Sequence, residues 1–182
     1  MLEKPAVVLV PIGPVPAGLL DHLLAPLGAT FGLPCQVAAS VPIPPRAYDP
    51  RRGQYVGGRI LTMLTRLDIP NAKRVLGVID ADCYTPGLNF ILGQARIHGR
   101  DAFIALARLR QSFYGLPEDE SLFRERAVKE AVHELGHTYE LHHCPNPKCV
   151  MHFSNSLRDT DVKAAEFCSR CWTQLREVTG GR

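Results

Sequence analysis

The sequence lacks any apolar run long enough to cross a lipid bilayer. The 182-residue chain is 46% hydrophobic, yet no segment approaches the roughly 20 consecutive apolar residues that a transmembrane helix needs. It also lacks a strong charge bias, because 21 basic and 18 acidic residues leave a formal net charge of +3. Such a mild balance neither requires nor excludes a nucleic-acid partner. We therefore expect a soluble protein without membrane or nucleic-acid partners.

The N-terminal residues also lack the pattern of a secretory signal or a lipidation site. Leu2-Glu3-Lys4-Pro5 leads directly into a short valine-rich run, so a reducing compartment is expected, where clustered cysteines favour metal over disulfides. No segment has the biased composition of a disordered tail. The length suits one well-buried core. We expect a cytoplasmic monomer with a single domain over residues 1–182.

Apolar patterns in the first half of the chain predict an α/β (α+β) fold. Strands are expected at Ala6–Ile12, Cys35–Ile43 and Arg74–Asp80, with helices over Pro16–Gly32 and Gly57–Leu67 between them. This βαβαβ order favours a mostly parallel, twisted sheet with covering helices. The next two strands, Phe90–Ile97 and Ala102–Leu109, are adjacent in sequence, so we expect an antiparallel pair with one strand at the sheet edge.

The second half of the chain reads as helical around a cysteine-rich segment. A long helix is expected to begin at a cap, Asp119 or Ser121, and to run to about Tyr139. A last helix is expected over about Val162 to Val178, after the cap signals at 159–161. We place a boundary between an N-terminal subdomain, about 1–140, and a small zinc-stabilised C-terminal subdomain, about 141–182.

The long helix carries the motif His133-Glu134-Leu135-Gly136-His137. Two histidines at i and i+4 lie about 6 Å apart along a helix and on one face, so both imidazoles can bind one cation. Zinc binds histidine nitrogens, and a catalytic zinc keeps an open position for water beside three protein ligands. Glu134 lies next to the first histidine, where its carboxylate can accept a proton from that water.

A third histidine, His143, completes the ligand set only if the helix stops. In a continuous helix it would lie about 15 Å along the axis from His133 and on another face. The chain must therefore fold back near Tyr139 or Glu140, which requires a left-handed residue that is usually glycine. Glu140 would carry a penalty of about 1–2 kcal/mol there. Glu140 itself and His142 are the alternative third ligands.

Four cysteines form a second set with metal-type spacing. Cys144 and Cys149 make one pair, and Cys168 and Cys171 the other. Two such pairs are the usual form of a closed structural zinc site. Two disulfides, in one of three connectivities, are the alternative. Because Cys144 directly follows His143, the two patterns share a junction, and we expect two zinc ions per chain.

Residues 133–151 and the later CxxC pair resemble the archaemetzincins, a branch of the metzincin metallopeptidases. The residues that match the family motif are His133, Glu134, His137, His143, Cys144, Cys149, Met151, Cys168 and Cys171. The resemblance implies a catalytic zinc on the three histidines, Glu134 as general base and Met151 as the Met-turn residue. Two departures are Glu140, where the family has glycine, and Phe153, where some metzincins have an oxyanion-stabilising tyrosine.

The leading hypothesis is a zinc-dependent metallopeptidase that hydrolyses peptide bonds with a water activated by Glu134. The resemblance also implies a cleft between the subdomains and an edge strand, Phe90–Ala95, that binds extended peptide by main-chain pairing. The alternative is a zinc-stabilised peptide-binding or interaction module with little or no catalysis, which Glu140 and the missing tyrosine motivate.

Overall fold

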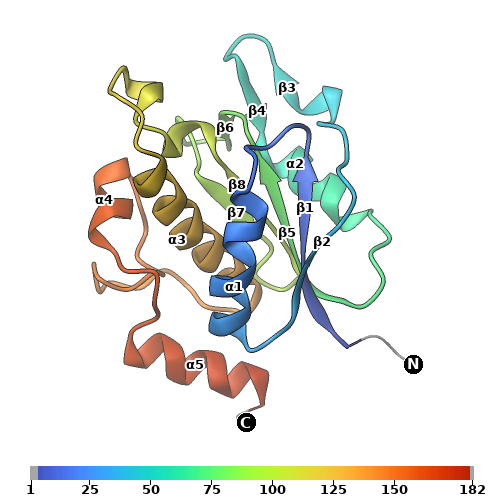
Figure 1. Cartoon of the computed structure of the whole chain (residues 1–182), viewed down its shortest axis with the longest axis vertical. Coiled ribbons are helices and arrows are strands. Elements are labelled where there is room, and N and C mark those ends of the chain that lie inside the picture. The colour runs from blue at the N-terminus through green and yellow to red at the C-terminus, as the bar shows by residue number, and fades with distance from the viewer. Residues whose placement is uncertain (1–3, 181–182) are drawn as a thin grey trace.

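A five-stranded sheet forms the centre of the computed structural model, which describes residues 4–180 (Figure 1). Its strands are β1 (Ala6–Ile12), β2 (Cys35–Val37), β5 (Ala72–Ile79), β7 (Gly93–Ala95) and β8 (Asp101–Ala105), in the order β2-β1-β5-β8-β7. Neighbouring strands are parallel except β7, which pairs antiparallel with β8 at the edge. The predicted mixed sheet with an antiparallel edge strand is confirmed. Leu2 and Glu3, in the segment where no targeting signal is expected, lie outside the described residues.

Alternating side chains on the central strands build a core on each face of the sheet. In β1, Val7 and Leu9 join the core under α1 (Leu19–Phe31) and α3 (Glu120–Thr138), whereas Val8 joins the core under α2 (Gly57–Thr65). This follows from the two-residue period of a strand, which directs successive side chains to opposite faces. Because both faces are covered, the central strand β1 is apolar and buried throughout. Figure 1 shows α1 and α3 in front of the sheet and α2 behind it.

A small second sheet lies beside the carboxyl ends of the central strands. It contains β3 (Tyr48–Asp49), β4 (Gln54–Val56) and β6 (Cys83–Tyr84), in the order β3-β4-β6. Short 3-10 helices, η1 (Pro45–Ala47), η2 (Ala107–Leu109) and η3 (Ser112–Tyr114), occupy the connections. Gln54 ties this sheet to the chain before β7, because its amide donates to Asp82 and to the carbonyl of Asn89.

Several predicted strands are shorter than their apolar patterns. The second strand ends at Val37, although Val41 still forms an isolated bridge with Ile12. The edge strand is confined to Gly93–Ala95. The predicted strand Ala102–Leu109 ends at Ala105 and continues as η2. In each case, apolar residues beyond the named strand remain packed against the core, and single backbone hydrogen bonds, such as those from Val41 to Pro11 and from Leu106 to Ile79, continue the pairing.

The predicted last helix, about Val162 to Val178, is present, but its predicted start is wrong, because the helix begins only at Ser169. The structure has two helices there, α4 (Leu157–Val162) and α5 (Ser169–Thr179), separated by an extended segment that begins at Lys163. Two backbone hydrogen bonds, from Ala164 to Lys148 and from Val150 to Glu166, pair this segment with the chain around Cys149. Tertiary pairing therefore interrupts the helical pattern.

The C-terminal segment packs on the same core as the long helix. Cys144, Cys149, Phe167 and Leu175 join the cluster that contains the buried face of α3. The division into subdomains at about residue 140 remains a prediction. Among the described residues, no helix combines the length and apolar character that a bilayer span requires.

Candidate metal centres

Helix α3 brings the two motif histidines together in a buried position. Asp119 caps the helix by accepting from the backbone N–H of Leu122 at 2.9 Å, as one of the two predicted caps. His133 and His137 are 4% and 9% exposed, and their Nε2 atoms lie 3.1 Å apart. The i, i+4 spacing therefore places both imidazoles on one face, as predicted.

Backbone carbonyls fix the orientation of these two rings. His133 Nδ1 donates to Val150 O at 2.7 Å, and His137 Nδ1 donates to Leu141 O at 2.7 Å. A neutral imidazole that donates through Nδ1 has only a lone pair on Nε2. In this tautomer the two Nε2 lone pairs face each other, an arrangement that suits a cation between them. Such carbonyl partners are typical of metal-binding histidines.

The chain reverses directly after α3, as the ligand geometry demands. Glu140 has φ 64°, one of two non-glycine residues with positive φ among the described residues. The backbone N–H of Leu141 bonds to Gly136 O at 3.3 Å, which closes the turn. The prediction of a left-handed residue at Glu140 is confirmed.

Packing on both sides holds Glu140 in this conformation. The ring of Tyr139 stacks on Phe31 with centroids 5.3 Å apart, and the guanidinium of Arg74 lies 3.8 Å from its other face. Leu141, on the other side, is 1% exposed. Burial of these two neighbours offsets the cost of about 1–2 kcal/mol for a non-glycine left-handed residue.

The reversal carries His143 back to the motif histidines. Its ring centroid lies 5.4 Å from that of His133 and 4.9 Å from that of His137. One ligand atom from each of the three residues lies within 4.8 Å of the others. Glu140 and His142 do not join this cluster, and His143 is its exposed member. Zinc–nitrogen bonds of about 2.0–2.1 Å place ligand nitrogens about 3.3 Å apart, so the cluster fits the ion after small side-chain movements.

Burial keeps all three imidazoles neutral near pH 7. Desolvation lowers the pKa of His133 well below its usual value and that of His137 to about 4, and it also lowers the pKa of His143. Neutral imidazole is the form that binds metal. The same burial, together with the neighbouring Glu130, raises the pKa of Glu134 well above its usual value. A nearby divalent cation would act in the opposite direction on that carboxyl group.

A glycine in the edge strand makes room for Glu134. A Cβ at Gly93 would lie 2.5 Å from Glu134 Cγ and 2.7 Å from its Oε1. The strand can therefore approach the carboxylate only because position 93 has no side chain. Sequence analysis did not single out Gly93, although a glycine inside a predicted strand is a signal of close approach.

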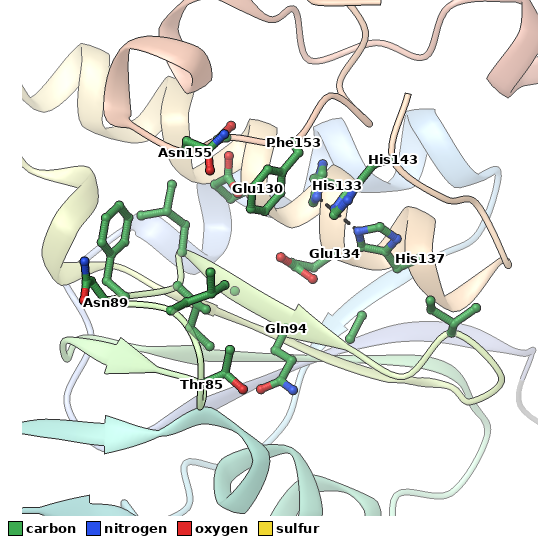
Figure 2. Close-up of a pocket in the computed structure, with 18 residues that line it drawn as sticks. Thr85, Asn89, Gln94, Glu130, His133, Glu134, His137, His143, Phe153 and Asn155 are labelled. Carbon is green, nitrogen blue, oxygen red and sulfur yellow. Dashed lines mark hydrogen bonds between the residues drawn. The ribbon is translucent and has the colours of Figure 1, made fainter. Parts of the chain in front are cut away.

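A cavity of about 400 Å³ opens in front of the histidines and Glu134. Its lining includes apolar side chains from the chain around β7, namely Leu88, Phe90 and Leu92. Phe153 lies beside His143 at the cavity (Figure 2). The outer edge of β7 borders this cavity and ends the five-stranded sheet. An extended peptide can pair with such an edge by main-chain hydrogen bonds.

The four cysteines form a second cluster immediately beside the first. Cys144 Sγ lies 3.8 Å from Cys168 Sγ, and one sulfur from each of the four residues lies within 4.8 Å of the others. A tetrahedral zinc with bonds of about 2.3 Å separates its sulfurs by about 3.8 Å. All six cysteines of the chain are free thiols in the structure. The geometry therefore fits metal and not a disulfide, whose sulfurs lie about 2.05 Å apart.

Main-chain groups direct hydrogen bonds at these sulfurs. The backbone N–H of Cys168 donates to Cys149 Sγ at 3.3 Å, and a backbone hydrogen bond from Cys171 lowers the pKa of Cys168 from 9.0 to about 7. Arg170 adds a guanidinium contact to Cys144 Sγ at 3.8 Å. These donors favour the thiolate, which is the metal-binding form, at Cys168, whereas burial raises the pKa of Cys149 and Cys171.

Met151 lies under the turn that joins the two clusters. It is fully buried, and a Cβ at Gly136 would lie 2.6 Å from its sulfur. Its carbonyl accepts from the backbone N–H of Cys144 at 2.9 Å, and the preceding carbonyl, of Val150, orients His133. The methionine therefore packs against Gly136 on the helix that carries both motif histidines, and the backbone at residues 150 and 151 connects His133 to Cys144.

Comparisons with known proteins agree with this geometry. The model of Peptidase family M54 matches residues 27–177. The archaemetzincin of Pyrococcus furiosus is 45% identical over 181 residues, which span 96% of this chain and 94% of the relative. That of Methanocaldococcus jannaschii is 41% identical over 167 residues, 92% of this chain and 90% of the relative.

Solved structures show the same architecture. The crystal structure of archaemetzincin from Methanopyrus kandleri superposes with a TM-score of 0.87 at 38% identity and covers 97% of this chain and 96% of its own. A zinc-dependent peptidase from Methanocorpusculum labreanum gives a TM-score of 0.84 at 29% identity over 93% of this chain and 100% of its own. The chain belongs to Peptidase family M54, the archaemetzincins, and is a zinc metallopeptidase.

Proposed function

We propose that His133, His137 and His143 hold the catalytic zinc and that Glu134 is the general base of peptide hydrolysis. The observation that supports this most directly is the pair of Nε2 atoms 3.1 Å apart, on rings whose Nδ1 atoms bond to backbone carbonyls, with a third imidazole brought beside them by the turn at Glu140. A zinc ion bound there polarises the scissile carbonyl and lowers the pKa of a water molecule to about 7.

Glu134 then acts as the proton carrier. Its carboxylate lies at the cavity, 6% exposed and held between α3 and Gly93. It accepts a proton from the attacking water and passes it to the leaving amine. Met151 supports the ligands from below without taking part in the chemistry. The edge of β7 aligns an extended peptide across the cavity.

The decisive experiment replaces Glu134 with glutamine. Because the amide cannot accept the proton, Glu134→Gln is expected to lower turnover by about 10³-fold or more while the zinc content stays unchanged. The matched control is Glu140→Gln, which makes the same change at an exposed position six residues away and leaves turnover intact. Peptide hydrolysis at the wild-type rate by Glu134→Gln would rule out the proposed role.

We further propose two zinc ions per chain, with the second held by Cys144, Cys149, Cys168 and Cys171. The histidine cluster opens onto the cavity, whereas three of the four cysteines are buried. Metal analysis of the purified protein is expected to find two zinc ions, and dialysis against a chelator is expected to remove one of them first, together with activity. A single tightly held zinc with an empty histidine cluster would instead favour the interaction module.

Both metal sites are complete within one chain, which supports activity as a monomer on peptide or protein substrates. The free thiols also support a reducing, cytoplasmic location. Neither site requires a second copy or a nucleic acid. Sedimentation of the active enzyme at the mass of one chain is the expected result, and activity confined to a larger assembly would contradict it.

A further inference from the structure

A buried ion pair next to the catalytic centre takes no part in the chemistry described above. Lys163 Nζ lies 2.8 Å from Glu130 Oε1, with side-chain exposures of 0% and 4%. Within residues 4–180, this is the ion pair in which both partners are most completely buried. Removing two charges from water is costly, and apolar side chains of similar volume often stabilise a fold equally well. Stability alone therefore does not explain the pair.

The ion pair connects α3 to the segment 152–155, whose last three residues line the cavity. Glu130 lies one helical turn before Glu134 and lines the cavity beside Phe153 and Asn155 (Figure 2). The same ammonium that binds Glu130 donates to the carbonyl of His152 at 3.5 Å. His152 follows Met151, and its Nδ1 donates to the carbonyl of Cys144 at 2.9 Å.

Further contacts hold Lys163 in place. Thr160 Oγ1 donates to Glu130 Oε1 at 3.3 Å, and the guanidinium of Arg126 binds both carboxylate oxygens of Asp161 at 2.6 and 2.8 Å. Residues 160–163 are therefore fastened along one face of α3. Through its hydrogen bond to the carbonyl of His152, the Lys163 ammonium also connects these residues to the backbone next to Met151.

We propose that the Glu130–Lys163 ion pair is a positioning element of the catalytic centre, which fixes the turn of α3 that carries Glu134 against the segment around His152. The inference rests on the proposed function of Glu134. Neither residue touches the reacting atoms. Because small displacements of a catalytic group affect the reacting geometry more than substrate binding, the pair acts on kcat and not on KM.

The test compares two variants, one that removes a single charge of the pair and one that removes both, so that a role in positioning the catalytic centre can be distinguished from a role in stability. Lys163→Met leaves the buried Glu130 without its cationic partner and is expected to lower both Tm and kcat. The double variant Glu130→Gln with Lys163→Met removes both charges, so its Tm is expected to return to within about 5 °C of the wild-type value. Its kcat is expected to stay about 10–100-fold low, with KM changed less than about twofold. The matched control, Glu120→Gln with Arg124→Met, removes an ion pair at the other end of α3 and keeps wild-type kcat.

A second readout does not depend on turnover. Cobalt(II) placed in the histidine site, with zinc retained by the cysteines, reports ligand geometry through its visible absorption. The double variant is expected to shift this spectrum, whereas the control is not. Wild-type kcat and an unchanged spectrum in the double variant would overturn the proposal. If the wild-type protein hydrolysed no peptide, the proposed function would fail, and the cobalt spectra alone would decide whether the pair positions the site.

Discussion

The two metal clusters meet at the peptide bond between His143 and Cys144, yet they differ in ligand type and access. The histidine cluster presents neutral nitrogens to a cavity of about 400 Å³, and His143 is exposed. The cysteine cluster gathers four sulfurs, two of which accept backbone hydrogen bonds, and three of the four residues are buried. An open site with three protein ligands suits catalysis, and a closed one with four suits structure. Under the proposed function, the adjacent residues His143 and Cys144 would serve a catalytic and a structural zinc, respectively.

The largest expected effect comes from removing half of the cysteine cluster. Replacing Cys168 and Cys171 with serine removes two thiolates, and a structural zinc contributes on the order of 10 kcal/mol of apparent folding free energy. We expect the double variant to unfold at a much lower temperature and to bind zinc at the histidine site more weakly, because Cys144 no longer anchors the residue after His143. Thermal unfolding and zinc titration measure the two effects.

The matched control for this experiment is Cys35→Ser. Cys35 is a partly buried thiol outside both clusters, so its replacement changes one sulfur without affecting metal. Unchanged affinity of the histidine site in the Cys168→Ser, Cys171→Ser variant would show that the two sites are independent despite their shared junction.

A smaller effect, on the order of 3 kcal/mol, is expected from the histidine cluster as pH falls in the metal-free protein. Burial lowers the pKa of His137 from 6.5 to about 4, so between these values the unfolded chain binds a proton that the folded chain does not. The stability contribution is therefore fully present above pH 6.5 and is lost progressively as the pH falls to 4. Urea unfolding at pH 7 and pH 4.5 measures it.

The comparison variant for this measurement is His137→Gln, which cannot titrate. Glu134 contributes with the opposite sign, because its raised pKa favours the folded state at low pH. The difference between wild type and His137→Gln cancels that contribution and isolates the imidazole. Equal pH dependence in the two proteins would contradict a depressed pKa at His137.

The smallest expected effect concerns the turn between the two sites. Glu140→Gly relieves a left-handed non-glycine residue and is expected to raise the free energy of unfolding by about 1 kcal/mol. Glu140→Ala removes the same carboxylate, and with it the exposed contact to His98, but keeps the backbone penalty. The free energies of unfolding of the two variants are compared by denaturant titration. A glycine variant that is no more stable than the alanine variant would refute backbone strain at this turn.

The sequence predicts much of both sites because their ligands lie in short, regular patterns. The spacing of His133 and His137 is local to a helix, and the need for a reversal at Glu140 follows from helix geometry alone. The cysteine pairs likewise have recognisable spacing. The βαβαβ opening and the antiparallel edge strand follow from apolar runs whose length and period are local properties.

The features that the sequence did not predict depend on contacts between distant segments. Helix α4 ends at Lys163 because the residues that follow pair with the chain near Cys149 and the ammonium of Lys163 forms an ion pair with Glu130. Gly93 matters only because Glu134, 41 residues later, approaches it. The stacking of Tyr139 between Phe31 and Arg74 likewise explains how glutamate replaces glycine at position 140.

The shared peptide bond between His143 and Cys144 also bears on the order in which the centres assemble. Once a metal binds the four sulfurs, only the five residues 138–142 separate His137 from an anchored His143. Closing so short a loop from a fixed end loses little further chain entropy. Filling of the thiolate centre first would thus preorganise the imidazole tripod. A nascent chain that acquires one ion is then expected to hold it on sulfur and to remain inactive until a second ion arrives.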